Sequence, residues 1–103
     1  MGADLYGVDQ TYFRDSYNCW NVLWQFGLSW WQDVMPLLDQ NRLLQPKAIV
    51  QVLGMLSDRE RVFLDNVADL PEDRRKQFTC KREELYGFLR QALPADAPIE
   101  CSL

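Results

Sequence analysis

The sequence contains no histidine, and its three cysteines, Cys19, Cys80 and Cys101, show no Cys-x-x-Cys spacing. Without an imidazole, a His-activated nucleophile, a His-ligated zinc and a histidine pH switch are all excluded. Structural zinc needs four ligands, and a disulfide scaffold needs a denser, even set of cysteines. We therefore expect free thiols, no metal site and no cofactor.

The chain also lacks long uncharged apolar runs and an excess of cationic residues. Asp15 and Asp33 interrupt its most hydrophobic region, so no membrane-spanning segment is expected. The first residues show neither the basic region nor the cleavage site of a signal peptide, which favours a cytoplasmic location. Lys and Arg number 11 against 15 Asp and Glu, a net charge of −4. Nucleic acids and anionic membranes require a cationic face, so a dedicated binder of either is not expected.

Sequence motifs of catalysis are scarce as well. There is no Gly-rich phosphate loop and no Gly-x-Ser-x-Gly. Asp58 and Asp65 fall at polar helical positions, where carboxylates serve solubility and ion pairing along the helix. Glu60 differs, because its place in the helical repeat faces the edge of the core. We expect a protein that is not an enzyme.

The 103 residues suffice for one domain, and their apolar pattern predicts helices. Apolar rows with a period near 3.5 favour a kinked helix over residues 11–35, a second helix over 46–68 that begins with Pro46, and a third that stops at Pro94. No segment alternates with period two under β-branched residues, so strands are not expected. The predicted fold is all-α, a small bundle of three long antiparallel helices in a single domain over residues 1–103, with residues 1–9 as an N-terminal arm and 95–103 as a flexible tail.

The break points of these helices stay open at three places. Gly27 suits a helix end, and Ser29 begins a capping-box match. Pro36 would clash with the carbonyl four residues earlier if it lay inside a helix. Ser57 begins another capping-box match, and breaks at these places would raise the number of helices to four or five.

All four tryptophans lie within residues 20–31, where the apolar arc exceeds half of a helix circumference. One interpretation is a central helix whose aromatic side chains fill the core. The other is an exposed aromatic strip that anchors a protein partner, because Trp and Tyr are common energetic anchors at interfaces. The candidate partner-binding residues are Tyr12, Arg14, Phe26, Trp30 and Trp31. The acidic residues around this strip suit a partner with a basic surface.

A basic cluster comprises Arg74, Arg75, Lys76, Lys81 and Arg82. Between Pro71 and Arg90, six basic residues stand against four acids, which leaves a local charge of +2. So small a surplus favours a solvated, self-paired face. A nucleic-acid-binding regulator that uses this cluster is the alternative.

The tryptophan-rich segment is preceded by Met1-Gly2-Ala3-Asp4-Leu5-Tyr6-Gly7 and Tyr12-Phe13-Arg14. In these features the first third of the chain resembles a group of small, uncharacterised bacterial and phage-type proteins that begin Met-Gly-x-Asp-x-Tyr-Gly and carry Tyr-Phe-Arg before a tryptophan-rich helix. The resemblance implies no activity. It implies that the arm and Arg14 belong to one feature, in which Gly2 and Gly7 let the backbone fold back and Asp4 pairs with Arg14.

Together these patterns predict a non-catalytic cytoplasmic protein that binds another protein through its aromatic, acidic N-terminal half. A phage-encoded inhibitor, or an immunity-type antagonist of a nucleic-acid-processing enzyme, fits the same size and charge. A nucleic-acid-binding regulator and a small-molecule binder that uses the tryptophans are further alternatives. The heptad rows also suit pairing across a homodimer, and this alternative stays open.

Overall fold

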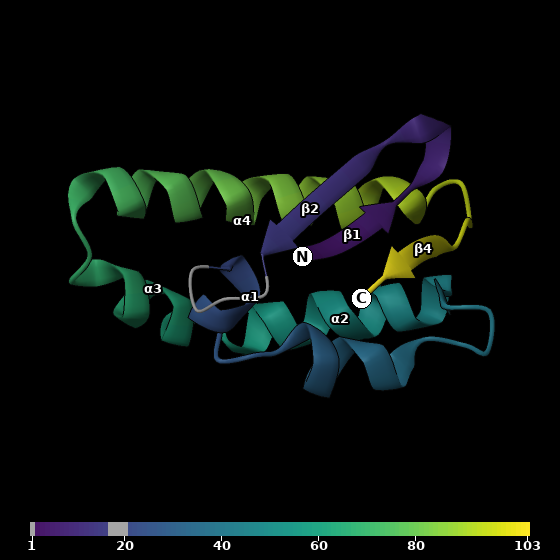
Figure 1. Ribbon diagram of the computed structural model, residues 1–103, viewed down its shortest axis with the longest axis horizontal. Coiled ribbons are helices and arrows are strands. Elements are labelled where there is room, and N and C mark those ends of the chain that lie inside the picture. Colours follow the sequence, from purple (N-terminus) through teal and green to yellow (C-terminus); the bar gives the residue numbers. More distant parts are fainter. Residues whose placement is uncertain (1, 17–20) are drawn as a thin grey trace.

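The computed structural model describes residues 2–16 and 21–103 and shows a mixed α/β fold with a four-stranded antiparallel sheet (Figure 1). The strands within the described residues are β1 (Gly2–Tyr6), β2 (Tyr12–Ser16), β3 (Leu43–Leu44) and β4 (Ile99–Ser102). Their order across the sheet is β2-β1-β4-β3. The first and the last strand of the chain therefore pair with each other at the centre of the sheet.

Helices form most of the remaining described chain. They are α1 (Val22–Gln25), the π-helix Trp30–Val34, α2 (Pro46–Asp58), α3 (Glu60–Ala68) and α4 (Glu72–Ala92), with short 3-10 turns at Val8–Gln10 and Met35–Leu37. Helix α4 packs against β2 and contacts α2 and α3. Figure 1 shows α4 passing behind the β1–β2 hairpin, so this helix covers one side of the hairpin.

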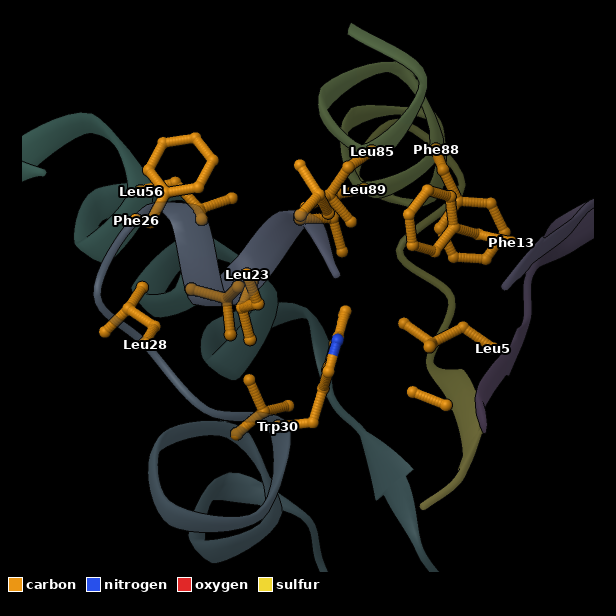
Figure 2. Close-up of a cluster of buried hydrophobic side chains, with 14 of the residues drawn as sticks. Leu5, Phe13, Leu23, Phe26, Leu28, Trp30, Leu56, Leu85, Phe88 and Leu89 are labelled. Carbon is orange, nitrogen blue, oxygen red and sulfur yellow. The ribbon is translucent and has the colours of Figure 1, made fainter. Parts of the chain in front are cut away.

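Alternate side chains of the strands point toward the helices and form the core with them. Leu5 and Phe13 are at most 1% exposed, and the Phe13 ring lies against Phe88 of α4 with 6.0 Å between ring centroids (Figure 2). Farther from the sheet, Phe26 stacks on Phe63 of α3 at 4.7 Å. Buried aromatic pairs of this kind join α1 to α3 and the sheet to α4.

The all-α bundle predicted from the sequence is wrong. The segments expected as an arm and a flexible tail contain β1 and β4, and the helix expected over residues 11–35 is replaced by β2, α1 and the π-helix. Residues 17–20 of that expected helix lie outside the described residues. The physical reason is that the central pair of the sheet, β1 with β4, joins the two ends of the chain, while each short run by itself gives only a weak pattern of period two.

The helix expected over residues 46–68 is divided in two. Pro46 begins α2, as predicted. Arg59 then adopts φ −112° and ψ 17°, which ends α2 and leads into α3, so the preference for one continuous helix was wrong. The third helix is longer than the expected apolar face, because α4 already starts at Glu72, and it ends before Pro94.

The first of the open break points is the one at Gly27 and Ser29. Gly27 adopts a φ of 73°, which ends the α1 segment. The Ser29 hydroxyl accepts hydrogen bonds from the backbone N–H groups of Trp31 and Gln32, so it caps the π-helix. Pro36 lies in the 3-10 turn that follows, outside any longer helix.

Candidate functional site

The outer face of the sheet is the most distinctive surface of the described residues. Because side chains alternate along a strand, Asp4 and Tyr6 of β1 point away from the core. Tyr12 and Arg14 of β2 lie opposite them in the register, and Glu100 of β4 lies opposite Tyr6 on the other side. We call these five residues, Asp4, Tyr6, Tyr12, Arg14 and Glu100, the tyrosine face.

The centre of this face is a pair of tyrosines that project into solvent. Tyr6 is 47% exposed and Tyr12 is 48% exposed, although both rings are large and partly apolar. Their ring centroids are 5.3 Å apart with an interplanar angle of 36°. The rings therefore support each other across the strands, yet each keeps one side open.

Polar contacts hold one of these rings in place. The Tyr12 hydroxyl donates a short hydrogen bond to Oδ1 of Asp4, and Nε of Arg14 lies 3.8 Å from the same oxygen. The hydrogen bond to Asp4, with smaller effects of burial and charge, raises the pKa of Tyr12 above its ordinary value, so the phenol stays protonated at neutral pH. Asp4 thus orients the Tyr12 ring directly, and Arg14 lies beside the same carboxylate oxygen.

Gly2 makes room for Arg14 in this arrangement. A Cβ atom at Gly2 would lie 2.6 Å from the carbonyl oxygen of Asp15 and 3.0 Å from Nε of Arg14. Any larger residue would displace the guanidinium from its position beside Asp4. The structure thus brings together the pair Asp4 and Arg14 that the resemblance singled out, on neighbouring strands of a hairpin.

The charge of the tyrosine face is negative. Asp4 and Arg14 offset each other, whereas Glu100 is exposed and has no ion-pair partner among residues 2–16 and 21–103. Glu100 is therefore an uncompensated acidic residue on the strand next to Tyr6, directly opposite it in the register.

The open edge of β2 is partly covered. Nζ of Lys81, from α4, donates a hydrogen bond of 2.8 Å to the carbonyl oxygen of Arg14 and lies 4.9 Å from the centroid of the Phe13 ring. A lysine that occupies a strand edge hinders the addition of a further strand. The outer face of the sheet is thus more accessible to a partner than the β2 edge is.

Two of the five predicted partner-binding residues lie in the core. Phe26 is fully buried and Trp30 is 2% exposed, so both are packing residues and the prediction that they anchor a partner is wrong (Figure 2). Trp31 is 53% exposed, but it lies on the π-helix and lines a separate cavity. Of the five predicted residues, only Tyr12 and Arg14 therefore meet at one surface. Trp20, the first of the four tryptophans, and Cys19 lie outside the described residues.

The indole N–H of the buried Trp30 belongs to a cluster of hydrogen bonds around the carboxylate of Asp15. Nε1 of Trp30 donates to Oδ2 of Asp15 at 2.9 Å, and the backbone N–H groups of Val22, Leu23 and Ser16 donate to the same carboxylate. Burial raises the pKa of Asp15, and these hydrogen bonds oppose that rise. The cluster joins β2, α1 and the π-helix, so Asp15 serves the fold.

The predicted basic cluster does not form one patch. Arg74, Arg75 and Lys76 lie on the exposed first turns of α4. Lys81 is engaged at the edge of β2, and Nη1 of Arg82 donates to Oε1 of Glu60. Arg74 also donates to Oε1 of Gln77, and Lys76 pairs with Glu72. At least four of the five cations are therefore engaged within the fold.

Glu60 lies at the edge of the core, where its place in the helical repeat puts it. Its carboxylate also accepts a hydrogen bond of 3.2 Å from the Tyr86 hydroxyl, while the Arg82 guanidinium lies 4.8 Å from the centroid of the Phe63 ring. Burial, with Glu60 nearby, raises the pKa of Tyr86 to about 12. This cluster fastens α3 to α4.

Sequence reasoning missed Tyr6 and Glu100. The signal that could have found them is the alternation of apolar and polar residues, in which Ala3 and Leu5 flank Asp4, and Ile99 and Cys101 flank Glu100. Each run is short and contains at most one β-branched residue, so its period of two was overlooked.

Comparisons with known proteins find no matching family model, no similar curated protein and no similar solved structure. Within the described part of the chain, cysteine and carboxylate side chains form no group of three that could hold a metal ion. None of the described helices has the length and apolar character needed to cross a membrane.

Proposed function

We propose that this chain is a non-catalytic binding protein that engages another protein through the tyrosine face. The observation that carries the proposal is the pair of half-exposed rings of Tyr6 and Tyr12, one of them held in place by Asp4 and Arg14. A ring that is already oriented loses little conformational entropy when a partner packs on it. Tyrosine is also among the residues that most often dominate the energy of interfaces.

The chemistry of the face favours an arginine or lysine side chain of the partner. A guanidinium or ammonium group is attracted to the face of an aromatic ring within about 6 Å. Beside Tyr6, the carboxylate of Glu100 would pair with the same cation. The partner in this proposal is therefore a protein with an exposed basic segment.

Antagonism of a nucleic-acid-processing enzyme is a special form of this proposal. Such enzymes present cationic surfaces to the nucleic acid, and an acidic protein that covers one of them would be an inhibitor. Association with that partner would weaken as the salt concentration rises, because charge attraction contributes to the encounter.

A purely structural role for the tyrosine pair is the main alternative. Cross-strand aromatic pairs stabilise a sheet by about 0.2–1 kcal/mol. Stability and binding must therefore be measured on the same variants. Replacement of Tyr6 by Ala removes one ring and leaves the hydrogen bond between Tyr12 and Asp4 in place, which makes it the first choice.

The experiment compares quantitative affinity capture from the native host by the wild-type protein and by Tyr6→Ala, with Trp24→Ala as matched control. Trp24 is 56% exposed and lies on α1, outside the tyrosine face. We expect a protein captured by the wild type and by Trp24→Ala to be lost with Tyr6→Ala, while the melting temperatures of the three remain close. Equal capture by all three, or loss with Trp24→Ala alone, would refute the proposal.

A further inference from the structure

We propose that the protein has a second site, independent of the tyrosine face, which binds a small monocarboxylate with an apolar body. The site is a cavity of about 390 Å³ at the far edge of the sheet. It is bounded by the π-helix, the loop that leads into β3, and the end of β4. Pockets for small organic ligands generally measure about 300–1,000 Å³.

The wall of the cavity is mostly apolar. It is formed by Trp31, Met35, Leu38, Cys101 and Leu103, and Asp39, Gln40 and Arg42 supply the polar side. Trp31 presents a ring that is 53% exposed. Burial raises the pKa of the Cys101 thiol to about 12, so this group stays neutral and adds no charge to the wall. Such a wall suits an aromatic ring or a short aliphatic chain.

Arg42 is the cationic residue of the cavity, and its backbone is fixed. It adopts a φ of 62°, a conformation that is uncommon for residues other than glycine. Its N–H donates to the carbonyl oxygen of Asp39, and its own carbonyl accepts from Cys101 N, each at 3.0 Å. In residues 2–16 and 21–103 no carboxylate forms an ion pair with its exposed guanidinium. A guanidinium binds a carboxylate through two parallel hydrogen bonds.

The nearby carboxylate of Asp39 is occupied by its own loop. Its oxygens accept hydrogen bonds from Asn41 N at 2.8 Å, Leu43 N at 3.0 Å and Gln45 Nε2 at 2.9 Å. These bonds, with that of Gln45 the strongest influence, lower the pKa of Asp39. Asp39 therefore stays ionised and shapes the loop that presents Arg42, and its carboxylate forms no ion pair with that residue.

Two unusual backbone features flank this one cavity. A π-helix is rare and occurs frequently at functional sites. Here it turns Trp30 into the core and Trp31 toward the cavity. On the opposite side, Arg42 holds a left-handed conformation that costs free energy unless the surroundings impose it. An apolar wall beside one unpaired guanidinium is the arrangement that a monocarboxylate with an apolar body requires.

The test is calorimetric or NMR titration of the full chain with phenylacetate and with octanoate, which represent aromatic and aliphatic acids. Phenylacetamide and octanamide are the neutral controls. We expect saturable binding of at least one acid, and binding weaker by about tenfold or more for its amide. Binding of phenylacetate alone would assign an aromatic acid, and binding of octanoate alone an aliphatic one. Binding of neither acid would overturn the proposal.

Substitutions of Arg42 test whether the acid binds in this cavity. Arg42→Asn removes the cation while Asn tolerates the left-handed conformation, and Arg42→Lys keeps the charge without the planar fork. We expect affinity to fall by about tenfold or more with Arg42→Asn and by less with Arg42→Lys. Arg61→Gln, on the exposed side of α3, is the matched control and should bind as the wild type does. Unchanged binding in Arg42→Asn, with its fold intact by circular dichroism, would overturn the proposal as well.

Discussion

Asp15 connects three parts of the chain through one buried carboxylate, so its oxygens are difficult to replace. In Asp15→Asn one of the two acceptor oxygens becomes an N–H donor and faces the N–H groups of α1 and Trp30. We expect the free energy of unfolding to fall by about 1–3 kcal/mol at neutral pH. Chemical denaturation with tryptophan fluorescence measures it. An unchanged midpoint would contradict the role assigned to Asp15.

The same substitution predicts a pH dependence. Burial raises the pKa of folded Asp15 above its ordinary value of 3.8, so the folded protein binds this proton more tightly than the unfolded chain does. The stability that protonation of Asp15 adds is therefore fully present below the unfolded pKa and is lost as the pH rises through the folded pKa, while the hydrogen bonds of the carboxylate remain. We expect the wild type's advantage over Asp15→Asn to shrink as the pH is raised from 3.8. If the advantage of the wild type instead grew with rising pH, the pKa of folded Asp15 would be lowered, which contradicts this account.

Cys101 and Cys80 differ in environment and should differ in reactivity. Cys101 is buried, with a pKa of about 12, whereas Cys80 is exposed on α4. The thiolate is the reactive form, so at about pH 8 iodoacetamide should modify Cys80 and spare Cys101 in the folded protein. Peptide mass mapping with and without denaturant checks this. Equal labelling of both in the folded state would show that β4 is not packed as described.

At the residue scale, the sequence predicted part of the candidate site. Tyr12 and Arg14 were singled out and do lie on the tyrosine face, together with Asp4. The sequence could not show that Phe26 and Trp30 are buried while other aromatic side chains are exposed. A helical wheel assumes one continuous helix, whereas the chain breaks at Gly27. Burial depends on the path of the backbone after that break.

At the scale of elements, two glycines offer a matched comparison. Gly27 has a φ of 73°, and a Cβ there would lie 3.2 Å from Nη1 of Arg59. Gly54 lies inside α2, and a Cβ there would meet nothing within 4 Å. We expect Gly27→Ala to destabilise the fold by about 1–2 kcal/mol and Gly54→Ala to stabilise it by about 0.5–1 kcal/mol. Thermal unfolding of both variants shows whether each substitution raises or lowers the stability. A change in the same direction for both would contradict the described backbone.

The contact between α3 and α4 yields a further prediction. Glu60→Ala leaves the largely buried guanidinium of Arg82 without its main acceptor, so we expect a loss of about 1–2 kcal/mol. Asp65→Ala on the same helix breaks only the exposed pair with Arg61 and should change stability by less than about 0.5 kcal/mol. Urea unfolding separates the two cases. A comparable effect of both would show that Glu60 acts as an ordinary surface charge.

The helices were more predictable than the strands for a physical reason. An amphipathic helix such as α2 carries its own apolar stripe and its own start signal at Pro46, so local sequence suffices. β1 and β4 need each other, and they are separated by almost the whole chain. Their runs of four or five residues have too little periodicity to outweigh the heptad-like rows around them.

At the scale of the whole molecule, the fold places the core and the tyrosine face on opposite sides of the sheet. The buried side chains of β1, β2 and β4 face the core, and the alternate, exposed positions of the same strands form the tyrosine face. The cavity beside Arg42 lies at the opposite edge, toward β3. Variants of Tyr6 or Tyr12 should therefore leave ligand binding in the cavity unchanged, because no residue of β1 or β2 lines it.

The most direct test of the central claim is NMR mapping of the isotope-labelled protein with a short arginine-containing peptide, compared with the same peptide carrying neutral citrulline. We predict that the arginine peptide shifts the amide signals of Tyr6, Tyr12 and Glu100 and their strand neighbours. The shifts should disappear with citrulline and in Tyr6→Ala. Shifts scattered over other acidic residues, or equal shifts with both peptides, would contradict recognition of a cation by the tyrosine face.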